Sequence, residues 1–305
     1  MNNIATLQNE PRQIQRLAAQ RRLYSDAKRI FAFQLMLGGP VAIGWAISVL
    51  LLPNLKGVAA AWGLLISLAD VCWLTPWQKR LRERAARIQE AFDCDVLQLP
   101  WNEITVGKPP EPELVKEQAD KYSKIQAKYP PLPNWYAPVV SELPLEVGRV
   151  ICQRANCWWD STQRRRYAAW VIGSVSFIAL MMLAFGFAGG LTIEKFVLTI
   201  VAPLSPALIL AYRQYTEQME AATRLDKLKE HAERLWADSC NRTARATLTN
   251  RSRTLQDEIF DNRKRSPLVF DWIFRKLRNN YDAQMNHGAQ ELTEQAKKRL
   301  GMAAG

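Results

Sequence analysis

The sequence predicts a mainly α-helical integral membrane protein, with four transmembrane helices arranged as two hairpins and a mostly helical cytosolic part. Three observations lead to this fold class. Four runs of apolar residues contain almost no charge, short links join them in pairs, and the excess of basic residues lies outside them. The chain of 305 residues carries 41 Lys+Arg against 29 Asp+Glu, a formal net charge of +12. The mean hydropathy of −0.20 is therefore an average over a membrane part and a basic cytosolic part.

The apolar runs are long enough to cross a bilayer. Residues 30–52 and 168–188 contain no charged residue over 23 and 21 positions. At a rise of ~1.5 Å per residue, about 20 residues of helix cover the ~30 Å hydrocarbon core. Residues 57–74 form a further run that Asp70 alone interrupts, and residues 196–212 form a shorter one. A buried helix of a soluble protein is the alternative interpretation, chiefly for 196–212.

The links between the runs determine the expected orientation. Residues 53–56 and 189–195 contain one lysine each, whereas the long segments that flank the runs are rich in Lys and Arg. Basic residues gather on the cytoplasmic side of membrane proteins. We therefore expect a multi-pass protein of the bacterial inner membrane, with both termini and the connector 77–166 in the cytoplasm. The first run predicts a signal anchor rather than a cleaved signal peptide. Aromatic residues typical of an interfacial belt stand near the inner ends of the runs: Trp73, Trp77, Tyr167, Trp170 and Tyr212.

These boundaries divide the chain into five parts. They are a cytosolic N-terminal helix over 1–29, a transmembrane hairpin over 30–76, a connector over 77–166 that is the candidate sensor region, a second transmembrane hairpin over 167–212, and a cytosolic C-terminal helical region over 213–305.

The connector is expected to be helical at both ends. Residues 77–92 continue the second run as a charged helical stalk, and 93–104 are expected to form a short extended segment. Helices are expected over 113–129 and over 141–160, the second of which leads into the third run.

The C-terminal region is expected to contain three helices, over 213–240, over 252–264 and over 268–281 after a break at Ser266 and Pro267. The last helix places apolar residues on one face and charged residues on the other. We expect it to pack against the other cytosolic helices, with a position in the membrane interface as the alternative.

No pattern in the sequence supplies catalytic chemistry. The two histidines, His231 and His287, lie in polar segments, and the motifs of zinc proteases, serine hydrolases, P-loop proteins and dinucleotide-binding proteins are absent. The five cysteines do not have the spacing of a zinc site or the density of a disulfide scaffold. We therefore expect no catalytic residue, no metal site and no cofactor, and a protein that is not an enzyme.

Three residues of the apolar runs are candidates for a role in membrane gating. Asp70 lies about one turn inside its run, where a carboxylate is costly to desolvate; the alternative is that it reaches the headgroups or pairs with Lys79 or Arg80. Pro40, after two glycines, and Pro206, after Ser205, are expected to kink their helices. Kinks serve gating, but they also occur in static bundles.

Residues 134–166 interleave aromatic, cationic and amide side chains. Aromatic rings stack on bases, Arg binds phosphates with paired N–H groups, and amides hydrogen-bond base edges. The stretch is therefore typical of a site for a cyclic nucleotide or an oligonucleotide. The alternative is that its C-terminal end is an ordinary interfacial belt beside a positive-inside cluster. The candidate ligand-binding residues are Trp135, Tyr136, Arg149, Gln153, Arg154, Asn156 and Arg165.

Four segments also carry a resemblance to a known family. They are NEPRQIQRLAAQRRLYSDAKR near the N-terminus, FDCDVLQLPWN, NWYAPVVSELPL, and ICQRANCWWDSTQRRRY before the third run. The chain resembles the SMODS-associated four-transmembrane effectors of bacterial CBASS anti-phage systems over nearly its whole length. The resemblance implies a protein that senses a cyclic di- or oligonucleotide made by a partner nucleotidyltransferase and then disrupts the inner membrane. It implies no catalytic motif.

Our leading hypothesis is a cyclic-nucleotide-activated membrane effector of anti-phage immunity that forms a homo-oligomer, contacts membrane lipids and causes abortive infection. We expect no direct binding of DNA or RNA. The alternatives are a nucleotide-independent anion channel or transporter with a cytosolic vestibule, a membrane-anchored scaffold and, least favoured, a membrane-bound enzyme.

Overall fold

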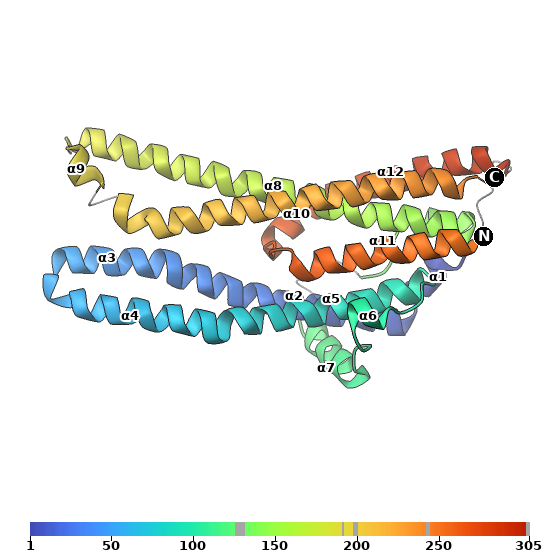
Figure 1. Ribbon diagram of the computed structural model, residues 1–305, viewed down its shortest axis with the longest axis horizontal. Coiled ribbons are helices and arrows are strands. Elements are labelled where there is room, and N and C mark those ends of the chain that lie inside the picture. Colours follow the sequence, from blue (N-terminus) through green and yellow to red (C-terminus); the bar gives the residue numbers. More distant parts are fainter. Residues whose placement is uncertain (126–131, 191, 198–200, 242–244, 303–305) are drawn as a thin grey trace.

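The structure is a computed structural model that describes residues 1–125, 132–190, 192–197, 201–241 and 245–302. Within these residues it contains helices and turns and no strand, so the mainly α-helical fold class is confirmed. Figure 1 shows an elongated molecule. Two helical hairpins project side by side toward one end, and their helices continue into a bundle with the chain termini at the other end.

The first hairpin consists of two long helices that each contain a π-helical segment. α2 (Pro11–Met36) continues through η1 (Leu37–Val41) into α3 (Ala42–Leu51). After the turn η2 (Pro53–Leu55), α4 (Lys56–Ala69) continues through η3 (Asp70–Leu74) into α5 (Thr75–Val96). Pro40 lies inside η1, because its ring and its missing N–H are incompatible with a regular α-helical turn there. A single π-helical turn is the form in which helices commonly accommodate such a defect.

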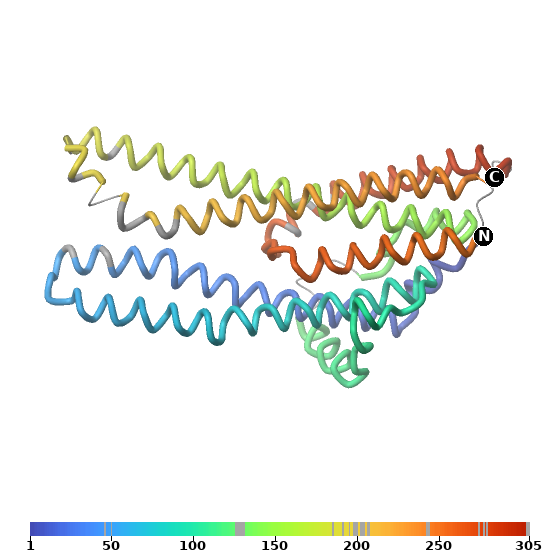
Figure 2. Tube along the Cα trace, in the orientation of Figure 1, coloured from blue at the N-terminus to red at the C-terminus, as the bar shows by residue number. Residues whose placement is uncertain are grey.

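The second hairpin is built from two longer helices. α8 (Leu145–Ala188) runs without interruption from the bundle to the tip, as the tube in Figure 2 shows. The short α9 (Ile193–Phe196) follows, and α10 (Ala202–Ser239) returns to the bundle. Pro206 falls within α10, but its side chain lies outside the described part of the structure. The pairing of the apolar runs into two antiparallel helix pairs follows the sequence prediction.

Three helices are long and apolar enough to cross a membrane, judged by length and composition: Pro11–Val49, Pro53–Val96 and Leu145–Ala188. Their apolar stretches are almost entirely unburied within the chain. Apolar surface of this extent is stable only against another apolar medium, so the chain is an α-helical membrane protein. The fourth run, 196–212, includes residues outside the described ranges, and its role as a membrane span stays a prediction.

The bundle buries the core of the protein. It adds α11 (Arg245–Arg265) and α12 (Asp271–Leu300) to the inner parts of α2, α5, α8 and α10. Shorter helical elements pack against the bundle: α1 (Ile4–Leu7), α6 (Glu103–Val106), α7 (Pro112–Ser123) and η5 (Pro138–Glu142). Leu17, Phe92, Ile151 and Leu235 are among its fully buried residues.

The expected extended segment over 93–104 is wrong at both ends, because 93–96 belong to α5 and 103–104 to α6. α5 continues to Val96, because Asp93 is held by Arg263 while Cys94 and Val96 are buried in the core. The chain then turns, with Gln98 at a φ of 52°, and re-enters a helix after Asn102. The Asn102 side chain accepts hydrogen bonds from the backbone N–H groups of 104 and 105, which is the chemistry of a helix N-cap.

One glycine allows α8 to approach η5 closely. A Cβ at Gly148 would stand 2.8 Å from the carbonyl oxygen of Val140 and 2.6 Å from Nδ2 of Asn2. Changing Gly148 to alanine is therefore expected to lower the free energy of unfolding by about 1–3 kcal/mol, the usual cost of overpacking. Thermal unfolding of the full chain in detergent measures the change. The matched control is Gly288→Ala in α12, where the nearest atom to the new Cβ is 3.8 Å away; a loss of the same size in both variants would contradict the close-approach explanation.

Candidate functional site: a basic cavity in the helical bundle

A cavity of about 260 Å³ lies in the bundle, close to the lower end of the roughly 300–1,000 Å³ typical of small-molecule sites. Residues of α2, α5, α8, α10, α11 and α12 line it, together with the chain around residue 135 and the break between α11 and α12. Three of these helices, α2, α5 and α8, are the ones that continue into the apolar stretches. The cavity therefore lies where the bundle meets the roots of the hairpins.

The lining of the cavity is strongly basic. It contains six cationic side chains and three carboxylates. The cations are Arg21, Lys28, Arg82, Arg164, Arg263 and Arg278, and the carboxylates are Asp160, Asp271 and Asp282. The positive excess in a partly desolvated space favours an anionic occupant.

Each of the three carboxylates is paired with one of the cations. Lys28 Nζ donates to Asp271 at 2.6 Å, and Arg278 Nε donates to Asp282 at 2.8 Å. Arg164 Nε lies 3.0 Å from an oxygen of Asp160. Outside these three pairs the wall holds Arg21, Arg82 and Arg263, and Arg263 is itself paired with the buried Asp93. The charge of Arg21 and Arg82 therefore remains.

Arg21 and Arg82 are cavity cations whose charged forms are disfavoured by burial. Burial lowers the pKa of Arg21, and the nearby Arg278 lowers it further. Burial also lowers the pKa of Arg82. Arg82 Nη1 donates to the carbonyl of Ser266 at 3.1 Å, while its buried Nε finds no hydrogen-bond partner among the described residues. An anion in the cavity would stabilise the charged form of both guanidinium groups.

Aromatic rings complete the wall. The guanidinium carbon of Arg21 lies 5.8 Å from the ring centroid of Trp135. Trp159 Nε1 donates to Asp282 at 3.3 Å, and its ring meets Tyr281 edge to face. Flat aromatic faces beside guanidinium groups are the combination that binds a base and its phosphate.

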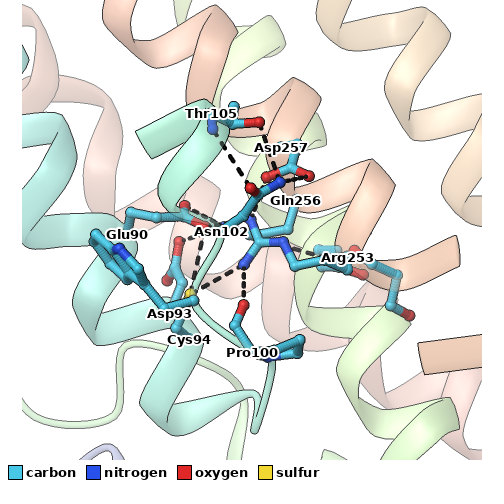
Figure 3. A network of polar contacts seen from close by, with 12 residues as sticks. Glu90, Asp93, Cys94, Pro100, Asn102, Thr105, Arg253, Gln256 and Asp257 are labelled. Carbon is cyan, nitrogen blue, oxygen red and sulfur yellow. Dashed lines mark hydrogen bonds and ion pairs between the residues drawn. The ribbon is translucent and has the colours of Figure 1, made fainter. Parts of the chain in front are cut away.

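A buried polar network lies behind this wall (Figure 3). Glu90 and Asp93 of α5 are completely buried, and Arg253 Nη2 donates to Glu90 at 2.6 Å. Gln256 Nε2 donates to both carboxylates, at 2.9 and 3.0 Å. Burial and the neighbouring Asp93 raise the pKa of Glu90, whereas the carboxylate of Glu90, working against burial, raises the pKa of Arg253. The negative charges of these two neighbouring buried carboxylates are therefore stabilised by the arginines that face them.

The network reaches the cavity through two residues. Arg263, which lines the cavity, donates to Asp93 at 2.5 Å. Asn156, also in the lining, donates to the hydroxyl of Tyr136 at 2.9 Å, and that hydroxyl donates to Asp93 at 2.6 Å. A change at the cavity wall is thus connected by direct hydrogen bonds to the charge balance of the core.

The structure brings three of the seven predicted ligand residues together. Trp135 and Asn156 line the cavity, and Tyr136 is buried directly behind them. Arg149 and Gln153 instead stabilise the core: Arg149 Nε donates to the carbonyl of residue 97 at 2.7 Å, and Gln153 Nε2 to the carbonyl of residue 252 at 2.8 Å.

The other two predicted ligand residues lie away from the cavity. Arg154 borders a smaller cavity of about 160 Å³ between α8 and α12 and pairs with Glu233 at 3.0 Å. Arg165 is on the surface, paired with Asp226. Ligand contact by any of the seven residues stays a prediction.

The cations contributed by the other helices were missed from the sequence. On α2, the lining residues Arg21, Tyr24 and Lys28 follow one another at intervals of three and four residues. On α8, the lining residues also recur at helical spacing, and they include Asn156, Gln163 and Arg164. Such polar stripes beside an apolar stripe are a usable signal of a second buried face. The stripes do not reveal that the two helices face one another.

Asp70 has a partner within the first hairpin. Its Oδ1 accepts a hydrogen bond from Gln34 Nε2 at 2.5 Å, and Thr75 Oγ1 lies at 3.4 Å. Among the described contacts, neither Lys79 nor Arg80 pairs with it. The Asp70–Gln34 hydrogen bond joins the two helices of the hairpin beside both π-helical segments.

Comparison with known proteins agrees with the membrane architecture. The family described as "SMODS-associating 4TM effector domain" matches residues 2–292. A probable CBASS effector molecule of Bacillus cereus (strain VD146) is 26% identical over 288 residues, which cover 91% of this chain and 94% of that protein. No solved structure matches the chain. The resemblance noted in the sequence is confirmed: the chain belongs to the SMODS-associating 4TM effector domain family.

Proposed function

We propose that this chain is a membrane effector of bacterial anti-phage immunity that a cyclic nucleotide activates. The observation that carries the proposal is the basic cavity with aromatic walls. A cyclic di- or oligonucleotide combines phosphates for the guanidinium groups with bases for Trp135 and Trp159. In this proposal a partner nucleotidyltransferase supplies the ligand. The name of the Bacillus cereus relative, a probable CBASS effector molecule, supports the effector role.

The position of the cavity supports a coupling between ligand and membrane. Lys28 lies about half a turn and Arg21 about two and a half turns before the first apolar run, and Arg164 lies about one turn before the third. A ligand that binds one arrangement of these helix roots more tightly than another shifts the population toward that arrangement. The chain itself performs no catalytic step in this mechanism.

In the membrane, the first hairpin supplies the features suited to a rearrangement. Pro40 lies in a π-helical segment, and the Asp70–Gln34 hydrogen bond holds the two helices together beside it. Pro206 belongs to the second hairpin and is the third gating candidate. One protomer has little room for a pore, so the active form is a homo-oligomer, with cyclic symmetry. The protein spans the inner membrane four times, with both termini in the cytoplasm.

Dye release from liposomes that contain the purified full chain tests the proposal. We expect little leakage without nucleotide and rapid leakage with one member of a panel of cyclic di- and oligonucleotides, while the linear form of the same nucleotide has no effect. Leakage without any nucleotide would favour the anion-channel alternative. No binding and no leakage across the panel would contradict the proposed function.

A further inference from the structure

Two tryptophans from distant parts of the chain form an exposed pair outside the cavity. Trp170 of α8 and Trp272 of α12 meet edge to face with ring centroids 6.2 Å apart, and each side chain is 48% exposed. Lys276 Nζ lies 4.9 Å from the centroid of Trp170. We call these three residues the Trp170–Trp272–Lys276 patch. An exposed cluster of this kind needs an amphipathic surrounding, because its rings are apolar and its ammonium group is charged.

The position of Trp170 places the patch at the membrane surface. Eighteen residues of continuous helix separate it from Ala188, where α8 ends at the tip of the second hairpin. At a rise of ~1.5 Å per residue this distance is ~27 Å, close to the ~30 Å thickness of the hydrocarbon core. With the tip of the hairpin at one face of the bilayer, Trp170 lies at the headgroup layer of the other. Tryptophan is enriched at that depth.

The charge around the patch selects the type of lipid. Arg166 and Arg275 are exposed on the same two helices. The charge of Arg275 also acts on Asp271, one turn before it, whereas no described ion pair joins Arg166 or Lys276 to a carboxylate. A cluster of basic side chains at the cytoplasmic headgroup layer attracts anionic lipid by about 1 kcal/mol per residue. A zwitterionic headgroup offers the same phosphate without net negative charge.

The same end of α12 also lines the cavity. Asp271, Arg278 and Asp282, at intervals of seven and four residues, face the cavity, whereas Trp272 and Lys276, four residues apart, share the neighbouring face. Figure 1 shows α12 starting near the middle of the molecule and running back toward the chain termini. One helix therefore contacts the ligand cavity on one face and carries the patch on the next.

We propose that the Trp170–Trp272–Lys276 patch binds the headgroup of an anionic phospholipid. The ammonium of Lys276 and the guanidinium groups of Arg166 and Arg275 contact the phosphate, and the two indole rings lie among the glycerol and upper acyl groups. The start of α12 is thereby a lipid-contacting element, although it lies more than 80 residues beyond α8 in the chain. Headgroup binding requires no nucleotide, so its test is independent of the proposed function.

Photo-crosslinking of the full chain in nanodiscs tests the proposal. The nanodiscs contain phosphatidylcholine with a small fraction of phosphatidylglycerol that carries a photoreactive group near the headgroup. Mass spectrometry after digestion by a protease that does not cut at lysine locates the adducts. We expect adducts on residues 166–170 and 272–276, and a roughly fivefold lower yield there in Lys276→Gln, since one basic residue is lost from the patch.

Two controls separate a specific site from general proximity to lipid. Lys298→Gln removes an exposed lysine from the far end of the same helix and is expected to leave the yield unchanged. A phosphatidylcholine probe with the same photoreactive group is expected to label the patch several-fold less. The proposal is overturned by adducts that avoid both segments, by equal labelling with the two lipids, or by equal yields from the Lys276 variant and the wild type.

Discussion

Changing Arg82 to glutamine is expected to weaken the binding of the proposed cyclic-nucleotide ligand roughly 10- to 100-fold. A hydrogen bond to a charged group contributes about 1.5–3 kcal/mol, and a factor of ten corresponds to about 1.4 kcal/mol. Arg82 lines the cavity and donates to Ser266, while its Nε has no partner among the described residues. Titration of nucleotide into the full chain in nanodiscs, followed by calorimetry, measures the affinity.

A second variant tests whether removing a negative charge from the cavity wall has the opposite effect on binding. Asp160→Asn removes a negative charge from the same cavity wall and releases Arg164 from its ion pair. This variant is expected to bind the nucleotide more tightly than the wild type. The surface control, Arg245→Gln, removes a cation that is 84% exposed and far from the cavity, and it should leave the affinity unchanged. If Arg82→Gln and Asp160→Asn both weaken binding to the same degree, the charge of the cavity does not determine affinity.

Changing Arg263 to methionine is expected to lower the free energy of unfolding by about 3–5 kcal/mol, the usual cost of removing one partner from a buried ion pair. Asp93 is completely buried, and Arg263 is its cationic partner at 2.5 Å, with Glu90 beside it. Without that guanidinium, two buried carboxylates share Arg253. Thermal unfolding of the full chain in one detergent, compared with the wild type, measures the loss.

The double change Arg263→Met with Asp93→Asn is expected to recover part of that stability, because it removes the uncompensated charge. Arg265→Met is the matched control, since its side chain is 73% exposed and its ion pair with Asp261 is on the surface. Exposed pairs of this kind contribute about 0.2–1 kcal/mol. A loss in Arg263→Met no larger than in Arg265→Met would show that the buried network does not stabilise the fold.

The membrane part of the fold was the most predictable from the sequence. A charge-free run such as 168–188 favours a membrane span over a buried soluble helix, because apolar helices of that length are stable in a bilayer. The extended segment expected over 93–104 is wrong at 93–96 for a tertiary reason. Local composition there is mixed, and the helix persists because Asp93 meets Arg263, which is 170 residues away in the chain.

The cavity depended on information that a single sequence does not contain. Of the candidate residues in 134–166, Trp135 and Asn156 line the cavity, and their contact with a ligand stays a prediction. Arg149 carries a guanidinium group that could also bind a phosphate, but its side chain is directed into the core, where backbone carbonyls accept its hydrogen bonds. Arg21, Arg82 and Arg263 come from three separate helices, and only the packing of those helices makes them neighbours.

The unequal construction of the two hairpins has a mechanical consequence. α8 is a continuous α-helix of 44 residues, a rod of ~66 Å that transmits a tilt from the bundle to the tip with little bending. Both helices of the first hairpin contain a π-helical turn, where the regular ladder of hydrogen bonds is loosened and the helix bends more easily. The second hairpin is therefore expected to resist bending more than the first. Deformation within the bilayer is expected to concentrate around residues 37–41 and 70–74, while α8 moves as a rigid body.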